Sequence, residues 1–289
     1  MVESHGVRLE ALGVHFAKPV RVKTLKPRTP ESCLIARGQK GGEASGSILP
    51  IAVDDMHAKA ITSRMVALNK YLLDPGRVDG IVFNGLKRIF NNADHPDFRW
   101  QWGGRFYSML RSDRYESLKG GKTARASLVR LDGEPVVETD ISASHLCILH
   151  GLMGLPFDGV TDPYDLGDPA RREEAKWFIT RAMGKATSDV GGKRYRWARE
   201  AALDRYPFLK DLGTNGIGTL DLQYHEAEIM MMAMKEARDR YGIGFLPMHD
   251  ALMVPWSKRD VGAEVLRGAF RRYFTEKLGL EYAPVPRVH

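Results

Sequence analysis

Apolar residues recur every three or four positions in several stretches of this chain, the spacing that buries one face of a helix. In the first such stretch, Asp54-Asp55 precedes a stripe that includes Met65 and Leu68, so a helix is expected to begin near the acidic pair. Asp168-Pro169 favours a second helix start, because proline suits the first helical turn. The predicted helices span residues 54–73, 78–90, 141–152, 169–183, 220–241 and 260–278.

Two other apolar runs predict β-hairpins. Leu128–Asp140 alternates between apolar and polar positions around Asp132-Gly133, a dipeptide typical of tight hairpin turns. Phe245–Val254 is a second run, and its tip or edge carries His249-Asp250. Asp140 and Asp250 are therefore each expected at the end of a strand, although they lie far apart in the sequence.

Composition narrows the class of protein. A chain of 289 residues with 43% hydrophobic residues suggests a soluble enzyme with one large domain or two interlocked subdomains. No apolar run approaches 18 residues, and the start lacks a secretory pattern, so neither a membrane span nor secretion is expected. With only Cys33 and Cys147, and no CxxC, we expect a reduced, cytoplasmic setting. The compact size of the chain suits a bacterial, phage or mobile-element context.

The net charge of +7 suits a polyanionic partner, and the basic residues gather in two stretches, 111–130 and 185–199. Tyrosine and tryptophan are interleaved with them, as in surfaces that contact phosphates and stack on bases: Tyr107, Tyr115, Tyr195 and Trp197. A solvated basic face is an equally good interpretation of the charge alone. Residues 1–50 are rich in turn and linker residues and are predicted to be a loosely ordered basic segment.

Asp140 and Asp250 are the strongest candidates for chemistry. Two carboxylates brought together by folding are what two Mg²⁺ ions need for phosphoryl transfer, with Mn²⁺ as an alternative ion. A strand-ending aspartate also commonly serves as a cap or turn residue. The neighbouring motifs favour the catalytic interpretation.

Three basic residues could contact phosphates near such a site. Arg172 and Lys176 are four positions apart on a predicted helix, so both point from one face, as a triphosphate clamp requires. The alternative is a solvated face balanced by Glu173 and Glu174. Gly103-Gly104 would let the backbone approach a ligand closely and bring Arg105 to a phosphate, unless this is a hairpin turn with an exposed arginine.

The order of these motifs resembles family A nucleic-acid polymerases, the group of DNA polymerase I and the single-subunit phage-type RNA polymerases. Asp140-Ile141-Ser142 resembles motif A, Arg172-x-x-x-Lys176 resembles the start of motif B, and His249-Asp250 resembles motif C. Gln223 lies in a segment similar to the family's glutamine-bearing palm helix, and residues 102–107 resemble an arginine-bearing element of the RNA polymerases. The similarity covers roughly residues 98–275.

The resemblance implies an α+β fold, a right-hand polymerase of reduced size with an antiparallel palm sheet and helical fingers and thumb. The palm would comprise residues 126–160 and 215–289, reduced fingers residues 161–214, and a helical thumb-like region residues 51–125. Asp140 and Asp250 would hold the metal ions, and Lys176 would act with them in catalysis. Residues implied in nucleotide binding are Arg172, Lys176, Ser142, His145 and Met183, and those implied in nucleic-acid binding are Arg105, Gln223 and His249.

The implied activity is a nucleotidyltransferase reaction: addition of nucleotides to a 3′ end on a DNA primer–template. His145 stands where DNA polymerase I has its sugar-sensing glutamate, and Met183 stands where the family usually has tyrosine. The bulk of His145 slightly favours deoxynucleotides and a role in DNA replication, with replication accessory proteins as further partners.

Other functions remain open. RNA or primer synthesis and template-independent end addition are alternatives within the polymerases. A metal-dependent nuclease would use the same carboxylates but would not need the basic helix. A non-catalytic nucleic-acid-binding protein on a polymerase-like palm is the third alternative.

Overall fold

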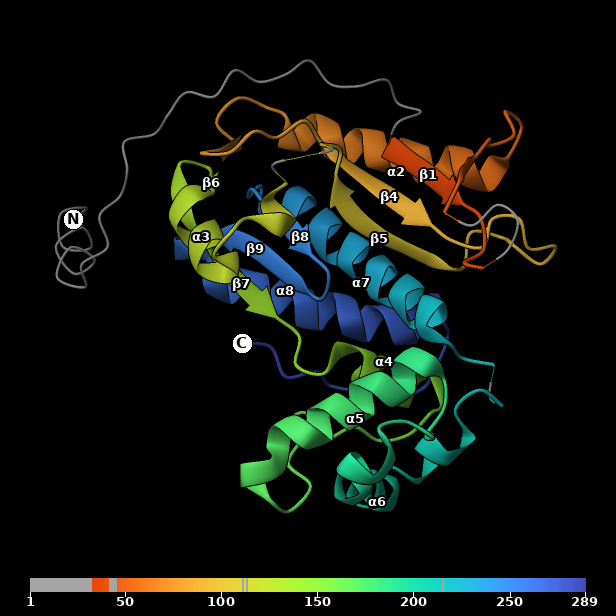
Figure 1. Ribbon diagram of the computed structural model, residues 1–289. Coiled ribbons are helices and arrows are strands. Elements are labelled where there is room, and N and C mark those ends of the chain that lie inside the picture. Colours follow the sequence, from red (N-terminus) through yellow and green to blue (C-terminus); the bar gives the residue numbers. More distant parts are fainter. Residues whose placement is uncertain (1–32, 42–45, 111, 113, 215) are drawn as a thin grey trace, which may run out of the picture.

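The computed structural model of the chain describes residues 33–41, 46–110, 112, 114–214 and 216–289. Most of the predicted linker-rich segment, and the basic residue Arg111, lie outside these ranges. The described residues form two β-sheets on either side of a long central helix, with a smaller helical lobe to one side (Figure 1).

The first sheet contains both predicted hairpins and is antiparallel throughout. Asp132-Gly133 forms the turn of one hairpin, and His249-Asp250 forms the two-residue turn of the other. In spatial order its strands are β3 (Val78–Asp79), β6 (Arg130–Leu131), β7 (Glu134–Asp140), β9 (Ala251–Pro255) and β8 (Leu246–Met248). Helix α8 (Arg259–Arg272), which continues into a π-helical turn at Tyr273–Lys277, packs on β7 and β9.

The second sheet is mixed, because β1 runs parallel to β4 while the other neighbours are antiparallel. Its strands in spatial order are β2 (Ile48–Leu49), β1 (Leu34–Arg37), β4 (Leu86–Phe90) and β5 (Gly103–Ser108). Helix α2 (Met56–Leu72) packs on β1 and β4, and helix α7 (Thr219–Asp239) packs on β5. The Asp55 side chain accepts a hydrogen bond from the Ala58 N–H at 2.9 Å, which confirms the predicted helix start.

The remaining helices connect the sheets and build the lobe drawn in green in Figure 1, where α5 and α6 pack together. They are α3 (Gly121–Leu128), α4 (Ser144–Leu152), α5 (Arg172–Lys185) and α6 (Arg196–Arg205). Short helical turns occupy Tyr115–Ser117, Pro169–Arg171, Gly192–Tyr195, Pro207–Asp211 and Trp256–Lys258.

The helix predicted in the amino-terminal half over residues 78–90 is wrong. Residues 78–90 form strands β3 and β4 rather than a helix, since Gly80 and Gly85 adopt φ values of 81° and 106° that interrupt a helix. The alternation of β4 is hidden because its middle inward position is a charged residue, Arg88, which is fully buried. Strands β1 and β2 also lie within the segment predicted to be loosely ordered, and strands β3 to β5 lie within the region 51–125 predicted to be helical.

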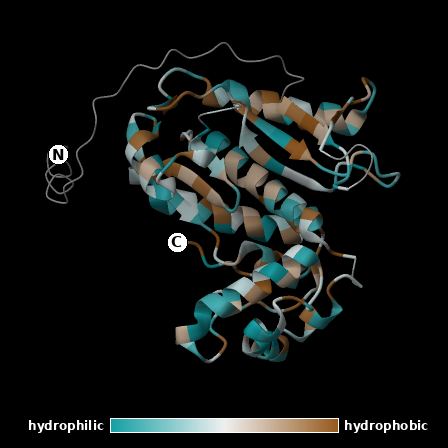
Figure 2. Cartoon of the chain, in the orientation of Figure 1, coloured by the Kyte–Doolittle hydropathy of each residue, from teal (hydrophilic) through white to brown (hydrophobic). Residues whose placement is uncertain are grey.

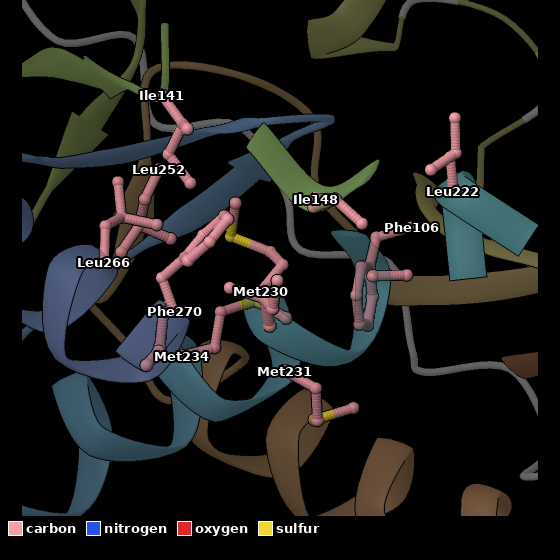
Figure 3. Close-up of a cluster of buried hydrophobic side chains, with 14 of the residues drawn as sticks. Phe106, Ile141, Ile148, Leu222, Met230, Met231, Met234, Leu252, Leu266 and Phe270 are labelled. Atoms are coloured by element: carbon pink, nitrogen blue, oxygen red, sulfur yellow. The ribbon is translucent and has the colours of Figure 1, made fainter. Parts of the chain in front are cut away.

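The main core lies where α7 and α8 meet the first sheet. Figure 3 shows Met230 and Met234 beside Phe270 and Leu266, with Leu252 of β9 close to them. All five are essentially inaccessible, so Met230 and Met234 of α7 serve packing. In Figure 2 hydrophobic residues follow β9 and the adjoining face of α7, whereas much of α5 and α6 is hydrophilic.

The structure therefore mixes helices with largely antiparallel sheets, which is compatible with the predicted α+β class. None of the described helices is both long enough and apolar enough to cross a lipid bilayer.

Candidate functional site

Strand pairing between β7 and β9 brings the two predicted aspartates together. Asp140 is aligned with Ala251, and the Ile141 N–H donates to the Asp250 carbonyl oxygen at 3.2 Å. Both aspartates line a cleft of about 570 Å³.

The backbone is strained beside each carboxylate. Ala143 (φ 50°) and His249 (φ 56°) both adopt the left-handed conformation, which costs a residue with a side chain roughly 1–2 kcal/mol. The first produces the sharp turn from β7 into α4, and the second produces the β8–β9 turn. These turns place Asp140 and Asp250 at one edge of the sheet.

Neither Asp140 nor Asp250 forms an ion pair with another of the described residues. Burial, together with the charges of Glu226 and Asp140, raises the pKa of Asp250 to about 7. Burial also raises the pKa of Asp140, although Lys122 opposes this effect, and Asp140 Oδ1 is buried without a hydrogen-bond partner among the described residues. The two carboxylates therefore concentrate negative charge at one end of the cleft.

A third carboxylate, Glu226 of α7, is neutralised by its neighbours. Its Oε2 accepts hydrogen bonds from Arg105 Nε at 2.7 Å and lies 2.6 Å from Arg105 Nη2. Its Oε1 lies 3.2 Å from His145 Nε2 and accepts a hydrogen bond from the Ser144 hydroxyl at 3.3 Å. Burial alone would raise the pKa of Glu226, but His145 and Arg105 outweigh burial and lower it.

The opposite wall comes from α5 and the loop before it. Lys176 makes no ion pair with any described residue, so its ammonium group is available to a ligand in the cleft. The Arg172 guanidinium already donates hydrogen bonds to Asp162 and to Glu173. The bond to Glu173 is 2.7 Å long. Both cations lie over the ring of Tyr164: the Arg172 guanidinium is 5.5 Å and the Lys176 ammonium 5.9 Å from its centroid.

The cleft gathers most of the residues singled out in the sequence. The site residues predicted from the sequence that line the cleft are Arg105, Asp140, Ser142, His145, Arg172, Lys176, Met183 and Asp250. Gln223 and His249 do not line it; the His249 ring instead lies 6.0 Å from the ring of Tyr107. Glu138, two residues before Asp140, is held by Arg125 of α3 at 2.6 Å and is not among the residues that line the cleft.

Sequence reasoning missed several residues of the cleft. Glu226 lies three positions after Gln223, and its place within the apolar stripe of α7 was the available signal for a buried carboxylate. Tyr164 and Asp162 come from a loop without periodicity. Arg287 and His289 come from the far end of the chain and carry no local motif.

The predicted stacking surfaces are only partly available. Tyr115 is 1% exposed, and its hydroxyl donates to the Pro247 carbonyl oxygen at 2.6 Å, so it cannot stack on a base. Tyr195 stacks on Trp177 at 3.8 Å, and the Trp197 ring lies under Arg171. The rings of Tyr195 and Trp197 thus make contacts within their own lobe.

No model of a known protein family matches this chain, and no curated protein matches it in sequence. Asp140, Asp250 and Lys176, none of which forms an ion pair with another described residue, line the same cleft, a combination suited to a metal-bound polyphosphate. Within the described ranges, no cluster of three or more His, Cys, Asp or Glu side chains could hold an ion by itself.

Proposed function

We propose that this chain is a nucleotidyltransferase, a template-directed polymerase that adds nucleotides to a 3′ end. The observation that carries the proposal is the meeting of Asp140 and Asp250 in one cleft with Lys176. Motifs A, B and C of the resemblance, distant in the sequence, converge there. DNA synthesis is slightly favoured, because His145 adds bulk to the cleft beside Ser142.

Mg²⁺ fits the residues present. The unpartnered Oδ1 of Asp140 and the raised pKa of Asp250 both indicate carboxylates that a cation would stabilise. Mg²⁺ is commonly held by one or two carboxylates together with substrate phosphates, so a site with few protein ligands suits it. When bound there, the ions would activate the attacking 3′ oxygen and neutralise the leaving pyrophosphate.

The protein side chains would position and stabilise the reactants. Lys176 would balance charge that grows on the transferred phosphates, and Tyr164 beneath it would restrict where its ammonium group lies. Arg172, tied to Asp162, would need to exchange that partner for a phosphate before it could contribute. Arg105, oriented by Glu226, would contact primer or template.

Primer extension tests the proposal. A labelled primer–template is incubated with Mg²⁺ and either deoxynucleotides or ribonucleotides, using the wild type, Asp140→Asn and Asp250→Asn. We expect extension by the wild type only, with folding and nucleic-acid binding nearly unchanged in both variants. Extension by both variants would refute the metal assignment, and the preferred nucleotide set decides between DNA and RNA synthesis.

The same assay separates the other classes of function. Primer shortening without nucleotides would identify a nuclease that uses the same carboxylates. Tight binding to the primer–template with neither reaction would identify a non-catalytic nucleic-acid-binding protein. Extension of a single strand without a template would identify end addition.

A further inference from the structure

The carboxy-terminal residues 284–289 form one wall of the cleft. The Ser142 N–H donates to the Arg287 carbonyl oxygen at 2.9 Å. Asp140 and His289 exchange two backbone hydrogen bonds, at 3.0 and 3.2 Å, and Ile141 forms an antiparallel bridge with Val288. This segment therefore pairs with the end of β7 at the residue proposed to hold the metal.

The segment is fixed before it reaches the cleft. Pro284 and Pro286 are buried, and a methyl group at Gly151 of α4 would lie only 2.8 Å from Pro284 Cγ. A methyl group at Gly159 would lie 2.2 Å from the Val285 carbonyl oxygen, so the backbones are in close contact there as well. Upstream, the Tyr282 hydroxyl accepts a hydrogen bond from the Phe157 N–H at 3.0 Å.

Alternation along this extended segment exposes Arg287 and His289, and both line the cleft. Arg287 makes no ion pair with a described residue, whereas Arg105 and Arg172 of the same cleft are each held by a carboxylate. Among the described cleft-lining residues, Lys176 and Arg287 are the lysine and arginine left without a carboxylate partner. Lys176 lies in α5, whereas Arg287 lies in the carboxy-terminal segment 284–289.

The charge of Arg287 acts on Asp162, which lies in the same loop as Tyr164. Burial opposes ionisation of Asp162, but bonds from Arg172 and the Tyr164 N–H, together with the charges of Arg172 and Arg287, lower its pKa. Arg287 and Arg172 thus act on the same carboxylate, and Lys176 lies one helical turn from Arg172. A chain of phosphates in the cleft would meet positive charge from both segments.

We propose that Arg287 binds the phosphate chain of the incoming nucleotide, opposite Lys176, and that the pairing of residues 284–289 with the end of β7 holds it in place. This inference rests on the proposed function for the identity of the ligand, but it also predicts binding of a bare polyphosphate. An arginine presents several N–H donors in a rigid fork, which suits phosphate oxygens.

The test measures calorimetric binding of inorganic tripolyphosphate with Mg²⁺ to the full chain. We expect Arg287→Gln and Lys176→Gln each to weaken binding about tenfold, the effect of one charge-assisted contact. Arg287→Lys keeps the charge and should retain a substantial part of the affinity. Arg267→Gln is the matched control, an exposed arginine of α8 that lines a different groove, and should bind as the wild type does.

Primer extension then relates the site to the reaction. Arg287→Gln should raise the KM for the nucleotide several-fold more than it lowers kcat. Wild-type affinity of Arg287→Gln for tripolyphosphate would overturn the inference. Weakened binding of the primer–template with unchanged tripolyphosphate affinity would also overturn it, because Arg287 would then contact a nucleic-acid backbone.

The two proposals fail in different ways. Loss of tripolyphosphate binding in Arg287→Gln, in a protein that extends no primer, would support the phosphate site and refute the polymerase. Extension by the wild type with an unchanged KM in Arg287→Gln would support the polymerase and refute the phosphate site.

Discussion

Glu226 holds Arg105 in place from inside the protein. The carboxylate side chain is 3% exposed, the arginine is 21% exposed, and their closest atoms lie 2.6 Å apart. The same carboxylate lies 3.2 Å from His145 Nε2, so one residue of α7 orients side chains from β5 and α4. The positions of Arg105 and His145 in the cleft therefore depend on a group that does not itself need to contact substrate.

Glu226→Gln should separate positioning from binding. The amide keeps the shape but removes the charge, so Arg105 loses its ionic partner and its orientation. We expect primer extension to slow by about tenfold to a hundredfold, as for small misplacements of reacting groups. We also expect a stability loss of about 1–3 kcal/mol in urea unfolding, because a partly buried charge is left unpaired.

Glu264→Gln is the control for that substitution, since Glu264 is 57% exposed on α8 and its ion pair with Arg240 is at the surface. It should change stability by less than about 0.5 kcal/mol. Unchanged extension kinetics in Glu226→Gln would show that the ion pair only stabilises the fold.

The ionised side chain of Asp250 should lower the stability of the folded protein when no divalent cation is present. Burial and the charges of Glu226 and Asp140 raise its pKa to about 7, so its ionised form is destabilising in a neutral, metal-free buffer. At pH 8 Asp250→Asn should be more stable than the wild type by roughly 1–3 kcal/mol. Addition of Mg²⁺ should then raise the Tm of the wild type more than that of the variant.

Asp97→Asn, at a side chain that is 81% exposed, is the control and should respond to Mg²⁺ as the wild type does. An equal Mg²⁺ effect on the wild type and Asp250→Asn would contradict the metal site.

Glu228 should make the protein sensitive to acid. Burial would raise its pKa, but Arg88 and Lys277 outweigh burial and lower the pKa to about 2. A carboxylate with a lowered folded-state pKa stabilises the fold above its unfolded pKa, and this contribution is lost as the pH falls toward 2. Glu228→Gln should therefore cost about 3–5 kcal/mol at pH 7 and markedly less at pH 3, measured by urea unfolding.

Glu173→Gln, whose side chain is 79% exposed, should show little change at either pH. A cost for Glu228→Gln that is the same at pH 7 and pH 3 would show that shape, and not charge, matters at this position.

Two helical glycines should respond oppositely to the same substitution. A methyl group at Gly151 of α4 would lie 2.3 Å from the Phe274 ring and 2.8 Å from Pro284, so Gly151→Ala should destabilise by about 1–3 kcal/mol. At Gly184 of α5 nothing lies within 4 Å, so alanine should stabilise by up to about 1 kcal/mol through helix propensity. Thermal unfolding of both variants checks the pair, and equal shifts would contradict the close packing at Gly151.

The sequence was informative wherever a local pattern and the final environment agreed. The stripe after Asp55 became α2, and Asp132-Gly133 became a hairpin turn. The prediction failed at residues 78–90, because Arg88 occupies an inward position of β4, where its charge is balanced by Glu228, 140 residues away. No local pattern can show that a charged position will be buried when its partner lies in another element.

The residues of the candidate site also differ in whether a local pattern could indicate them. Asp140, Asp250 and Lys176 could be proposed from motifs, because each stands in a recognisable local context. Glu226 and Arg287 could not, because their roles arise only when α7 and residues 284–289 are placed near the end of β7.

By itself, then, the sequence determined the helices with clear apolar stripes, the two hairpins, the basic charge and the identity of the acidic pair. Only the tertiary structure decided that Asp140 and Asp250 share a cleft, that Glu226 neutralises Arg105, and that residues 284–289 close one wall. Local spacing sets which face of an element is apolar. Burial and pairing of charges depend on which distant segments meet, and these long-range contacts leave no periodic pattern in the chain.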